Sequence, residues 1–289
     1  MSHRLGSWTP PHDADTALAL RGVHAGYAGA PRVLDCVGLT VGIGRRTAIL
    51  GANGSGKTTL LRVLSGAHRP DEGVVISGGA VLDHGRRALT AHRQQVQLVT
   101  QDPDDQLFSA DVRSDVAYGP TNLALPQPEV VARVAEALSV LSITELADRP
   151  VHRLSFGQRK RVAVAGALAM KPTVLLLDEP TAGLDPAGVE EMLAAVAALE
   201  AHGTTVVLST HDVDLAWRWA DEVALVVDGV VHQGEVTDAL TDTGLVRAAR
   251  LRPPWSIELL ARLGLDPAEV GWPRTPDEVA AALRVRAVP

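Results

Sequence analysis

The sequence predicts an α/β fold in which a mostly parallel sheet is flanked by helices. Residues 46–50 have the pattern of a short strand, a glycine-rich run follows at 51–58, and residues 59–65 then have helical spacing. A second strand is expected at 173–177, where the last four residues are apolar, as in strands that a parallel sheet buries on both faces. Beyond it, helical and strand patterns alternate, which is typical of this fold class.

The remaining elements follow from local patterns along the chain. Strands are expected at 16–27 and 32–41, joined by a Gly/Ala/Pro turn, and again at 96–100. Residues 111–170 have helical patterns interrupted by prolines. After the buried strand the expected order is a helix at 186–201, a strand at 204–209, a helix at 213–220 and a strand at 222–227.

The two ends of the chain differ from this centre. Residues 1–15 are polar, are predicted to be flexible, and lack the apolar stretch of a signal peptide. From residue 241 onward the chain carries a Pro-Pro pair and several arginines, and Thr275 with the Pro-Asp-Glu that follows predicts a helix start. We therefore expect a main domain at 16–240, with a helical part at about 102–170, and a small helical appendage at 241–289.

Composition excludes several classes of protein. The 289 residues are 46% hydrophobic, which is enough for a substantial core. A net charge of −7 argues against a sequence-independent nucleic-acid binder, which needs a basic surface. The single cysteine, Cys36, excludes an internal disulfide and suggests a reducing compartment. The longest apolar runs fall short of the ~20 residues needed to span a bilayer. We expect a soluble protein whose membrane role, if it has one, comes through a partner.

The glycine-rich run matches the phosphate-loop pattern G-x-x-x-x-G-K-[ST] without gaps. Its backbone N–H groups and the following helix N-terminus would bind phosphate oxygens. Lys57 would reach the β- and γ-phosphates, and Thr58 would place a hydroxyl on Mg²⁺. The predicted nucleotide-binding residues of this segment are Gly51, Asn53, Gly54, Ser55, Gly56, Lys57, Thr58 and Thr59.

Two adjacent carboxylates follow the buried strand. Asp178 is placed to hold Mg²⁺ through water, and Glu179 to orient or deprotonate an attacking water. Together with the phosphate loop they predict a P-loop NTPase. An Asn-Lys-x-Asp guanine-binding motif is missing downstream, which disfavours a GTPase. The expected cofactors are ATP and Mg²⁺.

Leu154-Ser-Phe-Gly-Gln158, just before an apolar helix, resembles the LSGGQ signature of the ABC ATPase family, with Phe156 as a departure. The resemblance implies a RecA-like core with an antiparallel β subdomain and an inserted helical subdomain. It also implies a second ATPase subunit, whose bound ATP would be contacted by the signature. The residues assigned to that contact are Ser155, Gly157 and Gln158.

Four further residues match motifs of the same family. Gln101 resembles the Q-loop glutamine that senses Mg²⁺ and couples to the membrane partner. Asp185, in Gly-Leu-Asp, resembles the D-loop that crosses the dimer interface, and His211 resembles the switch histidine that contacts the γ-phosphate. Tyr27 is placed where the family stacks an aromatic ring on adenine; a simple strand-end tyrosine is the alternative.

The stretch after Gln101 narrows the resemblance. Asp102-Pro-Asp-Asp-Gln-Leu-Phe108 and Asp115-Val-Ala-Tyr-Gly-Pro120 resemble the ATPases of energy-coupling factor transporters, particularly the cobalt/nickel branch. This implies an ATPase dimer, of identical chains or of paralogues, at the cytoplasmic face of the cell membrane. Its partners would be an integral membrane coupling protein and a substrate-binding membrane component. A vitamin or other solute as cargo, another importer, and a soluble non-transport ABC ATPase remain alternatives.

Two charged clusters can be interpreted from the sequence. Asp102, Asp104 and Asp105 are hypothesised to receive basic residues of the membrane partner, with a solvated acidic loop as the alternative. The run 159–161 is interpreted as a solvated helix start rather than a nucleic-acid patch.

Trp217 and Trp219 lie two apart on an expected helix, and we expect at least one of them in the core.

Overall fold

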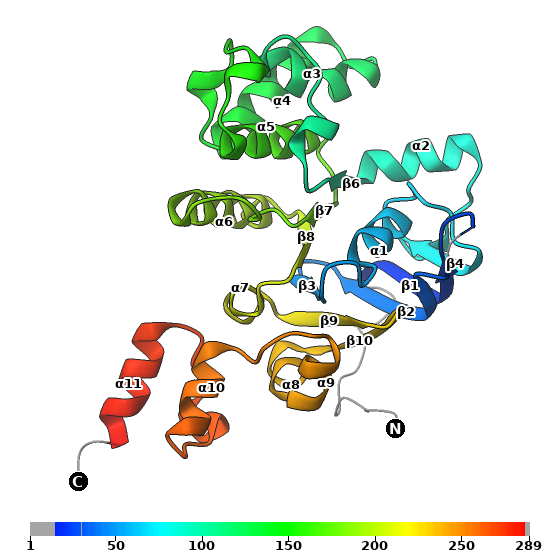
Figure 1. Cartoon of the computed structure of the whole chain (residues 1–289). Coiled ribbons are helices and arrows are strands. Elements are labelled where there is room, and N and C mark those ends of the chain that lie inside the picture. The colour runs from blue at the N-terminus through cyan, green and yellow to red at the C-terminus, as the bar shows by residue number, and fades with distance from the viewer. Residues whose placement is uncertain (1–14, 30, 287–289) are drawn as a thin grey trace.

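The computed structural model describes residues 15–29 and 31–286. The flexible segment predicted at 1–15 therefore lies, except for Asp15, outside the described residues. Figure 1 shows a central sheet, an antiparallel sheet on one side of it, a group of helices set apart from both, and C-terminal helices near α7 (Val213–Trp219).

The larger sheet has the strand order β10-β9-β3-β8-β7-β6. All neighbouring pairs in it are parallel except the edge pair β9–β10. Both β7 and β8 are buried along their whole length, so the α/β class predicted from the apolar strand is confirmed. The strands are β3 (Thr47–Leu50), β6 (Val96–Val99), β7 (Val174–Asp178), β8 (Thr205–Thr210), β9 (Glu222–Val227) and β10 (Val230–Glu235).

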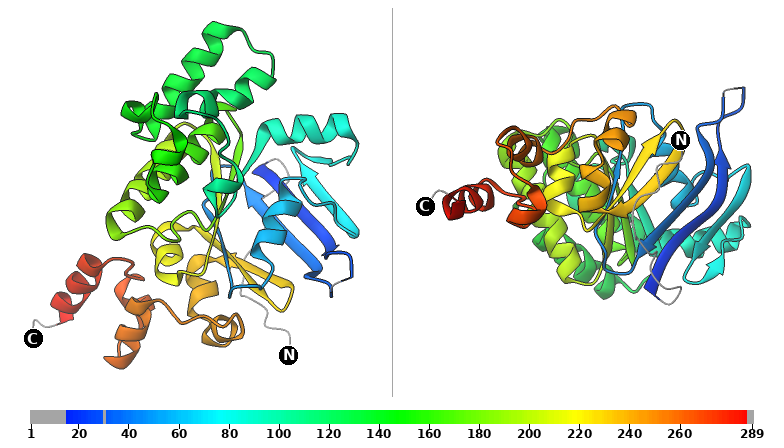
Figure 2. Two further views of the ribbon diagram at one scale, coloured as in Figure 1. Left: turned by 45° about the horizontal axis from the view of Figure 1, so that its top comes forward. Right: turned by 90° about the horizontal axis from the view of Figure 1, so that it is seen from below.

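The smaller sheet is antiparallel, with the order β2-β1-β4-β5, and the two views of Figure 2 show it packed beside the larger one. Its two long strands correspond to those expected at 16–27 and 32–41. A hydrophobic core joins both sheets to α1, with Leu18, Ile49, Leu61 and Val207 among its buried members. The elements are β1 (Thr16–Ala25), β2 (Leu34–Gly42), α1 (Lys57–Leu64), β4 (Glu72–Ser77), β5 (Ala80–Val81) and α2 (Arg86–Gln95).

The helical stretch expected at 111–170 consists of three α-helices that pack against one another, with short 3-10 turns between them. A second core runs from these helices to the opposite face of the larger sheet and on to α6 and α7. The helices are α3 (Val112–Asn122), α4 (Gln127–Val140), α5 (Phe156–Ala169), α6 (Pro186–Ala201) and α7 (Val213–Trp219).

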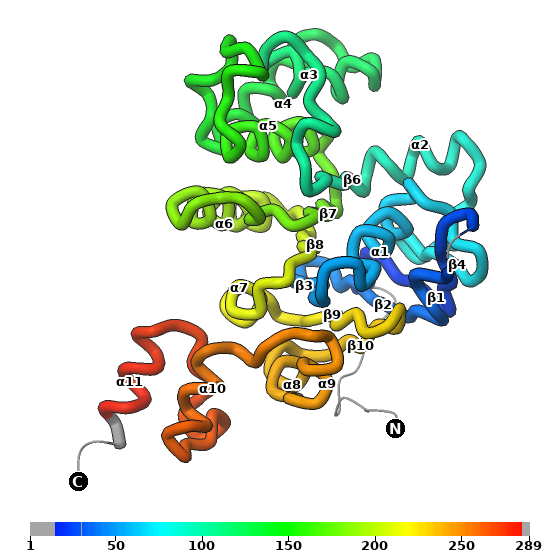
Figure 3. Tube along the Cα trace, in the orientation of Figure 1, coloured from blue at the N-terminus to red at the C-terminus, as the bar shows by residue number. Residues whose placement is uncertain are grey.

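The C-terminal segment is helical and is attached to α7. The Trp217 indole N–H and the Ser256 hydroxyl both donate to the Pro273 carbonyl, at 3.1 and 2.9 Å. Trp217 and Trp219 are both buried, which confirms the expectation of a core role. Figure 3 shows the trace doubling back below α7. The helices are α8 (Val236–Thr241), α9 (Thr243–Ala248), α10 (Trp255–Arg262) and α11 (Pro276–Arg286), the last beginning where Thr275 predicted.

Within the described part of the chain, every helix is too short or too polar to cross a bilayer.

Candidate functional site

The phosphate loop connects β3 to α1, as the sequence predicts. Gly54 and Gly56 have φ values of +80° and +111°, which side chains larger than glycine's rarely tolerate. A Cβ on Gly56 would also lie 3.1 Å from Cγ1 of Val33. These glycines let the chain fold tightly into the N-terminus of α1, where free N–H groups can bind an anion.

Lys57 lies at the mouth of this loop and is 6% exposed. Its ammonium donates to the carbonyls of Gly51 and Ala52, at 2.8 and 3.3 Å. The same nitrogen is 3.4 Å from Oε1 of Glu179. The ammonium therefore lies between the loop and the carboxylate, the place where the phosphates of a bound nucleotide would need a positive charge.

Asp178 ends β7, and its two oxygens are held by hydroxyl groups. Thr58 donates to Oδ2 at 2.8 Å, and Ser209 donates to Oδ1 at 2.5 Å. A carboxylate beside a threonine hydroxyl supplies the hard oxygen ligands that Mg²⁺ prefers. Among the described residues, no group of three or more His, Cys, Asp or Glu could hold a metal alone. The donor set thus fits a Mg²⁺ ion that takes its other ligands from phosphate and water.

Glu179 has a left-handed backbone with φ of +47°, which is uncommon for a residue with a side chain. Its N–H donates to both the carbonyl and the hydroxyl of Ser209, at 3.2 and 3.1 Å. Its carboxylate is buried and lies 3.0 Å from Nδ1 of His211, whose side chain is 57% exposed. The structure thus joins the predicted water-activating carboxylate to the predicted switch histidine.

Ser209 is a site residue that the sequence analysis missed. It is the last residue but one of β8 and pairs in register with Asp178 at the end of β7. Its side chain is fully buried and contacts both members of the carboxylate pair. A serine at a strand end gives no signal by itself, because the sequence does not show which strands are neighbours.

A cavity of about 400 Å³ lies over the phosphate loop and the carboxylates. Most of the residues predicted to bind the nucleotide and Mg²⁺ line this cavity. The lining residues are Tyr27, Val33, Asn53, Gly54, Gly56, Lys57, Thr58, Thr59, Gln101, Asp178 and Glu179.

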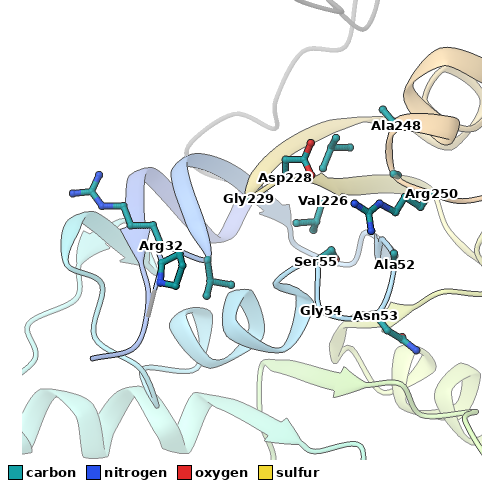
Figure 4. Close-up of a pocket in the computed structure, with 14 residues that line it drawn as sticks. Arg32, Ala52, Asn53, Gly54, Ser55, Val226, Asp228, Gly229, Ala248 and Arg250 are labelled. Atoms are coloured by element: carbon teal, nitrogen blue, oxygen red, sulfur yellow. The ribbon is translucent and has the colours of Figure 1, made fainter. Parts of the chain in front are cut away.

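A second cavity of about the same volume lies on the other side of the phosphate loop, between that loop, the β9–β10 turn and the end of α9. Figure 4 shows Ser55 and Arg250 at this cavity. Its described lining includes neither Asp178 nor Glu179, so it is not the place where hydrolysis would occur. Of the predicted nucleotide-binding residues, Ser55 lines only this second cavity.

The orientation of Tyr27, which the sequence left open, is fixed by three neighbours. Its hydroxyl is 3.3 Å from the Thr59 hydroxyl and accepts from Arg62 at 3.3 Å. The bond to Thr59 is the largest cause of a lowered pKa for the Tyr27 phenol. The ring lies 5.0 Å from that of His68 and is 42% exposed at the cavity. An exposed ring held in this way can stack on a nucleotide base.

Replacing Tyr27 by alanine is expected to raise the KM for ATP about tenfold, because stacking a base on an aromatic ring contributes about 1–3 kcal/mol. The kcat should change little, since the Tyr27 hydroxyl contacts Thr59 and Arg62 rather than the carboxylates. Steady-state phosphate release as a function of ATP concentration measures both values. Tyr27→Phe, which keeps the ring, is the matched control. Equal KM values for wild type and Tyr27→Ala would contradict base stacking.

The predicted signature and D-loop residues do not line the nucleotide cavity. Ser155 caps α5: its hydroxyl accepts from the Gln158 N–H at 3.2 Å, and the Gln158 side chain accepts from the Ser155 N–H at 3.0 Å. Asp185 caps α6 through a single bond, accepting from the Gly188 N–H at 2.7 Å. The two turns are in contact, since a Cβ on Gly157 would lie 3.3 Å from Leu184. Contact with the nucleotide of a second subunit remains a prediction for these residues.

The interpretation of residues 159–161 as a solvated helix start is wrong. Lys160 is only 4% exposed and points into the protein. Arg159 and Arg161 are paired with Asp104 and Glu191, at 2.9 and 3.2 Å. The apolar helix that follows the signature packs this segment against the larger sheet, so its charges are paired or buried.

Comparison with known proteins gives a consistent result. The sequence profile of the ABC transporter family matches residues 34–182. The cobalt import ATP-binding protein CbiO of Rhodobacter capsulatus is 49% identical over 270 residues, which is 92% of this chain and 96% of that protein. The energy-coupling factor transporter ATP-binding protein EcfA of Methanothermobacter thermautotrophicus is 40% identical, covering 90% of this chain and 84% of that protein.

Among solved structures, cbiO1 from Clostridium perfringens, described as part of the cbiONQ ABC transporter complex, superposes with a TM-score of 0.75. It is 38% identical and covers 86% of this chain and 98% of its own. The predicted architecture, with a parallel core, an antiparallel β subdomain and an inserted helical subdomain, is therefore confirmed.

Proposed function

The chain belongs to the ABC transporter family and is an ATPase, and from this premise we propose that it powers an energy-coupling factor importer for cobalt or nickel. One observation supports the ATP chemistry most strongly: Lys57, Asp178 and Glu179 line a single cavity. The importer type is supported by the stretch 102–120 and by the names of the relatives. We also propose the domain division at 16–240 and 241–289.

In the proposed reaction each side chain has one task. The phosphate loop and Lys57 bind the β- and γ-phosphates and neutralise part of their charge. Glu179 orients a water for in-line attack on the γ-phosphorus and accepts its proton, while His211, bonded to that carboxylate, contacts the γ-phosphate. Gln101 lines the same cavity beside the carboxylates. A bound Mg²⁺, held by Thr58 and Asp178, would supply positive charge to the phosphate oxygens.

We propose that a second ATPase subunit, identical or a paralogue, completes the site. Ser155 and Gly157 lie at the N-terminus of α5, an end of a helix that favours phosphate. Because they do not line the cavity of their own chain, their proposed target is the γ-phosphate on the facing subunit.

The surface proposed to meet the membrane partner lies after Gln101. Asp104 is already paired with Arg159, and the Asp102 carboxylate accepts from the Asp104 N–H, so we restrict the hypothesis of a contact with the partner's basic residues to Asp105. Beside it, the exposed rings of Phe108 and Tyr118 stack edge to face with centroids 4.5 Å apart. An acidic residue next to an exposed aromatic pair suits a basic, amphipathic helix of a coupling protein. The chain would then lie peripherally at the cytoplasmic face of the cell membrane.

The direct test is transport by the chain copurified with its membrane partners and reconstituted in proteoliposomes. We expect ATP-dependent uptake of radioactive Co²⁺ or Ni²⁺, and none with Glu179→Gln. Asp105→Arg is expected to lower both copurification and uptake by about tenfold or more, because like charges placed together at an interface cost several kcal/mol. The ATPase rate of the isolated chain should not change.

Glu145→Arg, a charge reversal at another exposed acid of the helical subdomain, is the matched control. ATP-driven uptake of a vitamin with no metal uptake would contradict the metal cargo. Full coupling by Asp105→Arg would contradict the proposed docking surface.

A further inference from the structure

Lys160 is a buried charge that the proposed reaction does not use. It lies in α5, one turn beyond Phe156 and therefore just behind the signature turn. Its ammonium donates to two consecutive carbonyls, those of Glu179 at 2.8 Å and of Pro180 at 3.2 Å. Its neighbours Arg159 and Arg161 form ion pairs with exposed acids instead. Lys160 is thus the member of the basic run that reaches the catalytic segment.

The backbone that Lys160 contacts is in an unfavourable conformation. The positive φ of Glu179 persists only where the surroundings fix it. On one side its N–H is held by Ser209, the residue before the last of β8. On the other side its carbonyl is held by Lys160. The carboxylate is thereby aimed at the cavity from a residue whose backbone is anchored on both sides of its Cα, through the N–H and through the carbonyl.

The position of the ammonium is itself well defined. It lies 5.3 Å from the centroid of the Phe156 ring, a cation–π distance. The same ring is close to Gly183, where a Cβ would lie 3.1 Å from it. Burial lowers the pKa of Lys160 to about 8, while the charge of Glu179 opposes that change, so the amine keeps its proton at neutral pH. Phe156, the departure from the usual signature, thus covers the lysine and contacts the D-loop.

We propose that Lys160 is a positioning residue that fixes the left-handed backbone of Glu179 and links it to the signature turn of the same chain. This inference rests on the proposed function, in which Glu179 acts on the nucleotide of its own chain and Ser155 on that of the facing subunit. The lysine then connects the two nucleotide sites of the dimer through a single side chain, so that displacement of α5 at one site moves the carboxylate at the other.

The test uses the full-length chain with Lys160→Met, which keeps an unbranched side chain of nearly the same length and removes the charge. We expect kcat for ATP hydrolysis to fall about 100-fold, because a catalytic group misplaced by about 1 Å loses that much, and the KM for ATP to stay within about threefold. Lys160→Arg, which keeps the charge and several donors, should recover part of the loss. Lys171→Met, at an exposed lysine in the turn after α5, is the matched control and should hydrolyse ATP normally.

A double variant separates positioning from a merely structural role. In single-turnover assays, adding Lys160→Met to Glu179→Gln should cause no further loss, because the carboxylate that the lysine positions is already gone. An unchanged kcat in Lys160→Met, or a further 100-fold loss in the double variant, would overturn the proposal while leaving the ATPase assignment intact. Normal turnover by Glu179→Gln would instead refute the proposed role of Glu179, and the Lys160 proposal with it.

Discussion

Glu179→Gln is expected to lower ATP turnover by about 10²- to 10⁴-fold, the range that a positioned general base contributes. The substitution keeps the shape of the side chain and its place beside His211. It removes the group that can accept a proton from water. ATP affinity should stay close to that of the wild type, because the groups proposed to bind the phosphates, which are the loop, Lys57 and the facing signature, are unchanged.

Phosphate release at saturating Mg-ATP measures the loss, and equilibrium binding of a fluorescent ATP analogue measures affinity. Glu190→Gln, at an exposed carboxylate of α6 paired with Arg218, is the matched control and should turn over ATP normally. Wild-type turnover by Glu179→Gln would show that another group activates the water.

Lys57→Ala is expected to act at the binding step and to weaken ATP binding by about 100-fold. Hydrogen bonds to charged groups contribute about 1.5–3 kcal/mol each, and each 1.4 kcal/mol is a tenfold change. Removal of this buried lysine would also leave Glu179 without the cation that lies 3.4 Å from its carboxylate. Lys57→Arg should restore binding only in part, since a planar guanidinium does not match the two loop carbonyls that the ammonium contacts.

Isothermal titration of the full-length chain with Mg-ATP gives the affinity directly. Lys171→Ala serves as the control, because it removes an exposed lysine whose partner is Glu136 rather than a loop carbonyl. ATP affinity unchanged in Lys57→Ala would contradict the phosphate-loop assignment.

Much of the ATP site could be predicted from the sequence because its chemistry depends on short segments. A phosphate loop requires glycine, lysine and threonine at fixed spacing, and β3 and α1 are adjacent to it in the chain. The carboxylate pair follows a strand whose apolar sequence already marks it as buried. The parallel sheet brings the ends of β3, β7 and β8 together, so these local signals meet in one cavity.

The contacts that the sequence could not predict depend on which elements are neighbours in space. Ser209 holds the Asp178 carboxylate and the Glu179 backbone N–H because β8 pairs with β7 in a register that places Ser209 opposite Asp178. Lys160 is buried because α5 packs over residues 179 and 180, although the run of three basic residues suggests an exposed face. Asp104 forms an ion pair because α5 also carries Arg159. Each of these contacts joins segments that are far apart in the sequence.

The most direct test of the proposed motor is the composition of the trapped transporter. Native mass spectrometry of the Glu179→Gln chain, purified with its membrane partners in Mg-ATP, counts subunits and bound nucleotides together. We expect two ATPase subunits, identical or paralogous, and two ATP molecules, with both nucleotides lost in a complex that also carries Ser155→Arg in every signature. A complex with one ATPase subunit, or one that keeps both ATP molecules despite the arginine, would contradict a site shared between two chains.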